Sequence, residues 1–312
     1  MKAKILIVGG GAMGTSVALH AAQRCDPLRE PVILIEKDRL GAGSSGRSAA
    51  IVHQGYSDRA LAGMARDALK VYSTFEATTG RSVGYRRTGV LFVCSHPDKK
   101  AELQRDIEMH QALGIEVQAV DDEGARQIVP GIQLEEGGFG AFEPAGGFID
   151  PVRTIEALAT MARAKGAVTR IGVADPTLLV EDGRVVGVST SAGNFYAPQV
   201  VLATGPWTPV ILRKFGVELP LRVVRMPEVF FEMPQPRREE EEEDAIGHDP
   251  MLLETDIRFA PDPLDSVRVA HPVIFDLDSG MHARCEPASR QTRVGRLGYG
   301  HADDVLDPDA FS

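Results

Sequence analysis

Three glycines near the N-terminus, Gly9, Gly11 and Gly14, have the spacing G-x-G-x-x-G. They follow the apolar run Lys4–Val8 and precede a segment whose apolar residues recur at helical spacing, which predicts a strand, a glycine turn and a helix. In such a turn Gly9 permits the sharp bend, Gly11 lets a pyrophosphate approach the backbone, and Gly14 lets the helix pack closely on the strand. The pattern therefore predicts a dinucleotide-binding site.

An acidic residue ends this unit. The second predicted strand, Val32–Ile35, leads directly into Glu36, which lies 22 residues after Gly14. A carboxylate there can accept hydrogen bonds from both hydroxyls of an adenosine ribose, and it disfavours the 2′-phosphate of NADP. The glycine turn and Glu36 together predict FAD or NAD, and they do not distinguish between these two cofactors.

Two later segments favour FAD. The loop at 41–48 offers hydroxyls and unhindered amides to a pyrophosphate or a flavin ring. The strand at 200–202 ends in the small residues Ala203-Thr204-Gly205, which would let the backbone pass close to a cofactor. The same glycine spacing recurs at Gly41, Gly43 and Gly46, inside this loop, but no second strand–turn–helix unit with this motif, which a separate nicotinamide cofactor would need, is predicted later in the sequence.

This combination of motifs resembles the FAD-dependent D-amino-acid oxidase superfamily, which includes glycine oxidase, sarcosine oxidase and dimethylglycine dehydrogenase. The matching segments follow one another in the family's order over about two thirds of the chain. They are VGGGAMG at 8–14, the strand that ends at Glu36, GSSGRSAAIVHQGY at 43–56, RTGVLFV at 87–93, GGFIDP at 146–151 and VVLATGPW at 200–207.

The resemblance implies oxidation of a C–N bond in an amino acid or N-methylated amine by hydride transfer to FAD. It implies noncovalent FAD, since the loop before Ser44 has neither His nor Cys, with Cys285 left open as an attachment point. The residues that it places around FAD are Gly9, Gly11, Ala12, Met13, Gly14, Glu36, Lys37, Ser44, Ser45, Ala49, Ala50, Val173, Ala203 and Gly205.

Three residues are expected on the substrate side. Arg284 matches the position of a carboxylate anchor, because a guanidinium binds a carboxylate through two parallel hydrogen bonds; a solvated strand arginine is the alternative. His53 can take a proton while hydride leaves, or it can be a structural histidine, and Tyr56 is expected to line the same pocket. His53 also fits hydroxyglutarate-dehydrogenase-like relatives, so an FAD-dependent 2-hydroxy-acid dehydrogenase is the alternative function.

The fold class expected is α/β, with a Rossmann-like, doubly wound FAD-binding domain interleaved with a substrate domain built on a mixed or antiparallel sheet. The boundaries expected are 1–80 and 142–212 for the FAD-binding domain, and 81–141 and 213–312 for the substrate domain. Helices are predicted at 59–78, 98–113 and 155–165, and strands at 88–93, 117–120, 168–173, 178–180 and 185–189. A tight turn is predicted at Asp182-Gly183, and extended, proline-interrupted chain after Pro206.

Composition excludes several classes of protein. The 312 residues carry a net charge of −10, which argues against a nucleic-acid binder, and no apolar run is long enough for a membrane span. The three cysteines form no CxxC pair, so no disulfide framework or metal site is predicted, and a cytoplasmic location fits best. His271 and His301 have no motif context and are predicted to be surface or core residues.

The C-terminal part departs from the family pattern. The family's closing segment over the flavin is missing from the sequence, so the chain is expected to be a truncated member, a catalytically incomplete fragment, or one subunit that needs a partner. The electron acceptor is not predictable. Six consecutive acidic residues, Glu239–Asp244, are predicted to form a solvated loop.

Overall fold

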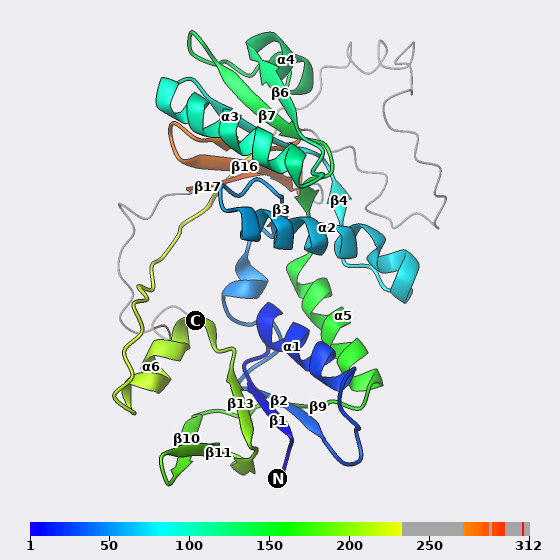
Figure 1. Cartoon of the computed structure of the whole chain (residues 1–312), viewed down its shortest axis with the longest axis vertical. Coiled ribbons are helices and arrows are strands. Elements are labelled where there is room, and N and C mark those ends of the chain that lie inside the picture. Colours follow the sequence, from blue (N-terminus) through cyan, green and yellow to red (C-terminus); the bar gives the residue numbers. More distant parts are fainter. Residues whose placement is uncertain (233–270, 287–288, 297–307, 309–312) are drawn as a thin grey trace.

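The computed structural model has two lobes joined by a narrower middle (Figure 1). It describes residues 1–232, 271–286, 289–296 and 308. The predicted acidic loop at Glu239–Asp244 and His301 lie outside these residues.

A parallel sheet forms the core of the lower lobe, in the order β13-β1-β2-β9. The four strands are β1 (Ile5–Val8), β2 (Val32–Glu36), β9 (Val168–Ile171) and β13 (Gln199–Leu202). Most of their residues are apolar, because both faces of a parallel sheet are covered. The strands predicted in these segments are confirmed.

Two layers cover this sheet. Helices α1 (Ala12–Ala22) and α5 (Pro151–Ala164) pack on one face around Ile7 and Leu34, and an antiparallel sheet covers the other face around Leu6 and Ile33. This second sheet consists of β10 (Thr177–Glu181), β11 (Arg184–Thr190) and β12 (Gly193–Tyr196). Asp182 and Gly183 join β10 to β11 with φ of 48° and 74°, which is the tight turn predicted.

A seven-stranded mixed sheet forms the upper lobe, in the order β14-β17-β16-β15-β5-β7-β6. Among the described strands of this sheet, only β15 and β5 pair in parallel, and the other neighbours are antiparallel. The strands are β5 (Val90–Cys94), β6 (Gln118–Asp121), β7 (Phe139–Glu143), β14 (Val229–Glu232), β15 (Val273–Asp276), β16 (Met281–Glu286) and β17 (Gln291–Arg296). Helix α3 (Pro97–Ala112) packs on one face, against Phe92, and α4 (Asp122–Ile128) packs on the other, against Leu91.

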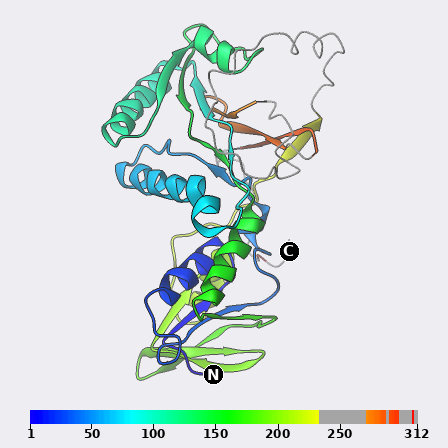
Figure 2. The ribbon, with the colours of Figure 1, turned by 90° about the vertical axis from the view of Figure 1, so that its right-hand side faces the viewer.

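Helix α2 (Arg59–Thr79) and a small sheet lie between the two lobes (Figure 2). The small sheet has the order β3-β8-β4, with β3 (Ile51–Val52), β4 (Arg86–Arg87) and β8 (Gly147–Phe148). Asp58 begins α2 by accepting hydrogen bonds from two amides of the first turn, and Gly80 ends it with φ of 67°. The expected fold class is confirmed: a Rossmann-like unit is interleaved along the chain with a mixed-sheet unit.

The prediction of extended chain directly after Pro206 is wrong. A 3-10 turn, η2 (Gly205–Trp207), leads into the short helix α6 (Thr208–Arg213). Both prolines here occupy first-turn positions, where the missing N–H costs no hydrogen bond. Helix α4 and strands β7 and β12 were not predicted either, because they are short or rich in glycine.

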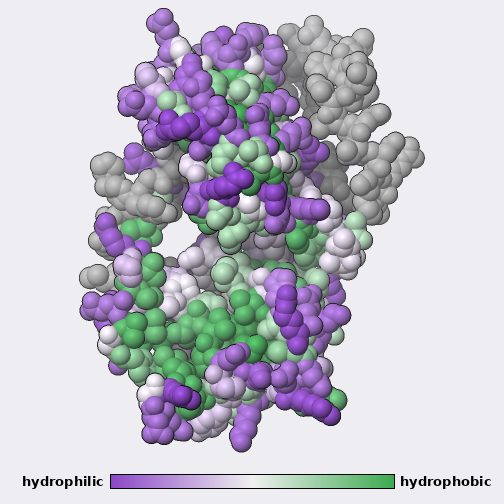
Figure 3. All heavy atoms as spheres, in the orientation of Figure 1, coloured by the Kyte–Doolittle hydropathy of each residue, from purple (hydrophilic) through white to green (hydrophobic). Residues whose placement is uncertain are grey.

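Apolar side chains gather on the lower lobe, over β13 and between α6 and α1 (Figure 3). Met13 and Val210 are exposed in those helices. No described helix is long and apolar enough to cross a membrane.

Candidate active site

The carboxyl ends of all four parallel strands meet at one edge of the sheet. Gly9 follows β1 and donates its amide to the Ile35 carbonyl of β2 at 2.9 Å. Val173 follows β9 and donates to the Glu36 carbonyl at 2.9 Å, and Ala203 follows β13 and donates to the Val8 carbonyl at 2.8 Å. In parallel α/β sheets this edge is where ligands bind. Four segments of the predicted cofactor site therefore lie together.

The glycine turn is packed too tightly for side chains. Gly9 has φ of 110°, and a Cβ there would overlap the backbone of Ala203. A Cβ on Gly14 would overlap the Gly9 carbonyl oxygen, so helix α1 can approach the end of β1 only with glycine at both positions. Gly205, at the far side of this edge, has φ of 53°.

The N-terminus of α1 is open to a ligand. Its N-cap, Gly11, supplies no side-chain cap, and the first turn contains no acidic residue. The Ala12 amide is met by the Ser45 hydroxyl at 3.2 Å, and the next side chain, Met13, is 71% exposed. Amides at a helix start carry partial positive charge, so this end of α1 suits a phosphate group.

Glu36 is fixed beside the glycine turn. Its Oε2 accepts a hydrogen bond from the Gly10 amide at 2.6 Å, and its Oε1 accepts one from the Asp38 amide at 2.9 Å. A carboxylate has about four lone-pair positions, so each oxygen retains one for a ribose hydroxyl. Lys37 places its ammonium over the Trp207 ring, 4.1 Å from the centroid. Trp207 was not singled out from the sequence, and only the three-dimensional contact identifies it.

Residues 44–50 connect this edge to the small sheet between the lobes. The turn η1 (Ser44–Arg47) begins beside the glycine turn, through the Ser45 contact with Ala12. Ala50 has the left-handed φ of 49°, donates to the Ser48 hydroxyl and accepts a hydrogen bond from the Ile149 amide. Ser44, Ser45, Ala49 and Ala50, predicted near the cofactor, therefore lie on a segment that leaves the glycine turn and enters the small sheet.

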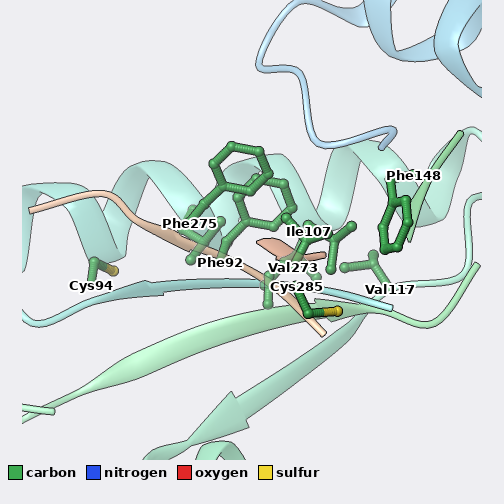
Figure 4. Close-up of a cluster of buried hydrophobic side chains, with 11 residues drawn as sticks. Phe92, Cys94, Ile107, Val117, Phe148, Val273, Phe275 and Cys285 are labelled. Atoms are coloured by element: carbon green, nitrogen blue, oxygen red, sulfur yellow. The ribbon is translucent and has the colours of Figure 1, made fainter. Parts of the chain in front are cut away.

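His53 lies among aromatic rings three residues further on. Its ring stacks on Tyr56, with centroids 4.7 Å apart, and meets Phe92 and Phe275 edge-on at 5.6 and 5.1 Å. Phe92 and Phe275 stack on each other at 5.0 Å (Figure 4). The structure therefore brings two of the three predicted substrate-side residues, His53 and Tyr56, into contact.

The His53 ring is neutral at pH 7. Burial, together with a smaller contribution from the charge of nearby His110, lowers its pKa from 6.5 to about 4. His53 Nδ1 is buried and has no hydrogen-bond partner among the described residues. A neutral imidazole with an unpaired nitrogen can accept a proton or a hydrogen bond from a small ligand.

The third predicted residue, Arg284, lies on β16 and is 6% exposed, so its interpretation as a solvated strand arginine is wrong. Its guanidinium donates to the Ala49 carbonyl, pairs with Glu286 and lies over the Phe148 ring at 4.3 Å. Its Nε is buried without a partner among the described residues. These contacts place Arg284 against the segment that carries Ala49 and Ala50.

Sequence reasoning missed three further residues on this face of the sheet. Arg293 on β17 stands directly opposite Arg284, and pairs with Glu228. His282 on β16 faces Phe275, and burial lowers the pKa of His282 despite the nearby Glu228 carboxylate. None belongs to a local motif; the strand register brings them together.

The other residues considered from the sequence have structural roles. Cys285 lies in the core of the upper lobe, with its Sγ donating to the His271 carbonyl at 3.4 Å. His271 contacts the Thr292 hydroxyl at 2.9 Å through Nε2. In the described part of the chain no cluster of His, Cys, Asp or Glu could hold a metal ion.

A buried carboxyl group supports the His53 segment from behind. Glu143 accepts hydrogen bonds from the Gln54 amide at 2.6 Å and the Gln54 side chain at 2.8 Å. Burial raises its pKa to about 7, and these hydrogen bonds limit the rise. Glu143 and Phe92 line a cavity of about 330 Å³ between α3 and the sheet.

Comparison with known proteins agrees with this geometry. A family model described as FAD dependent oxidoreductase matches residues 4–291. The chain is 27% identical over 220 residues to mitochondrial dimethylglycine dehydrogenase of Rattus norvegicus, covering 70% of this chain and 25% of the relative. It is 26% identical over 224 residues to peroxisomal sarcosine oxidase of Homo sapiens, covering 71% and 55%. The chain thus matches between a quarter and just over half of the length of these relatives.

Solved structures show the same fold. L-proline dehydrogenase from P. horikoshii superposes with a TM-score of 0.77 at 22% identity, over 98% of this chain and 72% of that one. Glycine oxidase from Geobacillus kaustophilus gives a TM-score of 0.71 at 18% identity, over 98% and 73%.

Proposed function

Because the chain belongs to the FAD dependent oxidoreductase family, we propose that it oxidises the C–N bond of an N-methylated amine or a small amino acid. The observation that carries the proposal is the edge where Gly9, Glu36, Val173 and Ala203 meet beside the open N-terminus of α1. The similar proteins act on dimethylglycine and sarcosine, which favours N-methylated amino acids as the substrate class.

The residues at this edge fit FAD. The start of α1, with Ala12 and Met13, has amides for a diphosphate, and Glu36 retains acceptor positions for a ribose. Gly11 has only the Ser45 side chain nearby, so a ligand can approach its backbone. We assign the remaining contacts to the residues predicted from the sequence, which are Lys37, Ser44, Ser45, Ala49, Ala50, Val173, Ala203 and Gly205. When bound, FAD supplies the acceptor for a hydride.

The substrate-side residues bind the substrate, orient it and accept a proton from it. His53 is neutral at pH 7, and its unpaired Nδ1 can accept the proton of a substrate ammonium group. The aromatic rings of Tyr56, Phe92 and Phe275 exclude water from one side of His53. Arg284, predicted as the carboxylate contact, has its charge balanced by Glu286, and its unpaired Nε is the donor left for that role.

The domain boundaries that we propose are 1–80 and 142–212 for the FAD-binding part, and 81–141 and 213–312 for the substrate part. The parallel sheet, from β1 to β13, and the seven-stranded sheet, from β5 to β17, support this division. A cytoplasmic location stays a prediction.

The test is the visible absorption spectrum of the purified chain, with and without added FAD, followed by anaerobic addition of single substrates. Sarcosine, dimethylglycine, glycine, D-alanine and 2-hydroxyglutarate separate the substrate classes. Bleaching of flavin bands by an amine supports the proposal, and bleaching by the hydroxy acid alone replaces it with the dehydrogenase alternative.

Failure to bind FAD would contradict independent activity of this chain. Uptake of FAD only after a second protein is added would identify the chain as one subunit of a larger enzyme. Repeating the bleaching with oxygen or a quinone as oxidant identifies the electron acceptor.

A further inference from the structure

Two arginines from the upper lobe hold the backbone of residues 44–50, the FAD-facing segment of the proposed site. Arg293 donates from Nη2 to the Arg47 carbonyl at 2.7 Å and from Nη1 to the Ser48 carbonyl at 3.3 Å. Arg284 donates from Nη1 to the Ala49 carbonyl. Three consecutive carbonyls, from 47 to 49, therefore accept hydrogen bonds from residues about 240 positions later in the chain.

Strand pairing sets this arrangement. Arg284 on β16 and Arg293 on β17 are directly opposite in the antiparallel register. Opposite residues project from the same face, with Cβ atoms about 5 Å apart. The register thus places the two guanidinium groups side by side. Their separation allows them to donate to neighbouring carbonyls of one short segment.

The two charges are balanced locally. Arg293 pairs with Glu228, and Arg284 pairs with Glu286, which also lies 3.8 Å from Arg293 Nη1. The side chains of Arg284 and Arg293 are 8% and 12% exposed, so unpaired charges would be costly at both positions. The pairs also fix the orientation of each guanidinium, which leaves defined N–H groups for the carbonyls.

The segment held in this way touches both lobes. At one end the Ser45 hydroxyl contacts the Ala12 amide in the glycine turn, and at the other end Ala50 leads through β3 to His53. Between them Arg284 and Arg293 attach the segment to the seven-stranded sheet through the three carbonyls.

We propose that Arg293, with its counter-ion Glu228 and its neighbour Arg284, is a positioning residue that clamps residues 47–49 and so fixes the FAD-facing segment relative to the substrate-side sheet. The proposal rests on the proposed function for its link to FAD, but the clamp itself is a property of the chain alone. It gives Arg284 a role in holding backbone, which differs from that of a carboxylate contact.

The test compares Arg293→Gln and Arg293→Lys with Arg296→Gln, an exposed arginine at the end of the same strand, as the matched control. Lysine keeps the charge but has one nitrogen, so it cannot reach two carbonyls and Glu228 together. We expect both Arg293 variants to speed hydrogen exchange at the amides of Ser48 and Ala50 by at least about tenfold without FAD, and to leave β9 unchanged. The control should match the unmodified chain.

Two further readouts link the clamp to FAD. Both Arg293 variants should weaken FAD binding about tenfold by fluorescence quenching, and should alter the visible circular dichroism of the bound flavin. A general loss of stability would instead speed exchange in β9 as well, and would overturn the proposal. An Arg293→Gln variant in which the Ser48 and Ala50 amides exchange at the unmodified rate would also overturn the proposal. If the unmodified chain binds no FAD, the proposed function fails. The hydrogen-exchange comparison still shows whether Arg293 holds residues 47–49.

Discussion

His53 and Tyr56 form a stacked pair with ring planes only 17° apart, while Nδ1 of His53 is buried without a hydrogen-bond partner in the described chain. The stack and the two phenylalanine rings orient the imidazole, so its unpaired nitrogen has a fixed direction. A fixed, neutral acceptor can take a hydrogen bond or a proton from a substrate amine, although a pKa of about 4 makes it a weak base.

Replacing His53 should therefore slow the reaction in a pH-dependent way. We expect His53→Gln to lower kcat/KM for an amine substrate about 100-fold at pH 7, a typical loss for a general base. The defect should shrink towards pH 10, because the substrate ammonium then loses its proton to water. Steady-state kinetics from pH 6 to 10 checks this, with Tyr56→Phe, which keeps the ring, as the control. A defect of equal size at every pH would contradict a base role for an amine and favour a structural one.

Glycine at position 14 should be indispensable. A Cβ there overlaps the Gly9 carbonyl oxygen, so Gly14→Ala should push α1 away from β1, abolish FAD binding at micromolar concentrations and lower the melting temperature. Gly63, in the second turn of α2, is the matched control, because no other part of the structure lies within 4 Å of its Cβ position. Gly63→Ala should stabilise the chain by about 0.5–1 kcal/mol, because alanine favours a helix. Calorimetry and FAD titration measure both; tight FAD binding by Gly14→Ala would refute the assigned site.

Loss of the Glu36 carboxylate should weaken FAD without unfolding the chain. Hydrogen bonds to a charged group contribute about 1.5–3 kcal/mol, so Glu36→Gln should raise the FAD dissociation constant at least about tenfold. Asp38→Asn, which changes an exposed neighbour, should leave it unchanged. Equal affinities for the two variants would show that the ribose is not held by Glu36.

Stability should depend on pH through two opposing groups. The pKa of Glu143 is raised from 4.5 to about 7, so the folded state binds more protons between these values and Glu143 lowers stability as pH rises. The pKa of His53 is lowered from 6.5 to about 4, so the unfolded state binds more protons and His53 raises stability as pH rises. Across its own range each group changes the free energy of unfolding by roughly 3 kcal/mol, at about 1.4 kcal/mol per pH unit. The two changes have opposite sign, so the free energy of unfolding varies little between pH 4.5 and 6.5.

Replacing one of the two groups should reveal the pH dependence of stability that the other causes. Glu143→Gln should give stability that increases from pH 4.5 to 6.5, and His53→Gln should give stability that decreases from pH 4.5 to 7. Urea unfolding at half-unit pH steps measures both slopes. A flat profile in either variant would mean that the remaining group does not titrate in this range.

Much of the FAD-binding unit could be predicted from the sequence because its signals are local. The glycine turn, the strand that ends at Glu36 and the helix at 59–78 each depend on residues within one or two turns of chain. The substrate side could be predicted only in part. His53 and Tyr56 lie three positions apart in the sequence, but Arg293 and Glu228 lie 65 positions apart and meet where β14 pairs with β17. No local pattern encodes that pairing, so Arg293 and Glu228 could not be predicted from the sequence.

The interleaved topology also determines when the molecule can fold during synthesis. One edge of β1 pairs with β2 within 36 residues, but its other edge waits for β13, where Ile5 is paired with Gln199. At about 5–20 residues per second, the ribosome takes on the order of 10–40 s to reach that partner. Through this interval an apolar strand edge lies exposed on the nascent chain, a ready template for mispairing. The yield of folded protein should therefore rise with co-produced chaperones and with a lower growth temperature. Substitutions on the surface of the folded protein should affect this yield less.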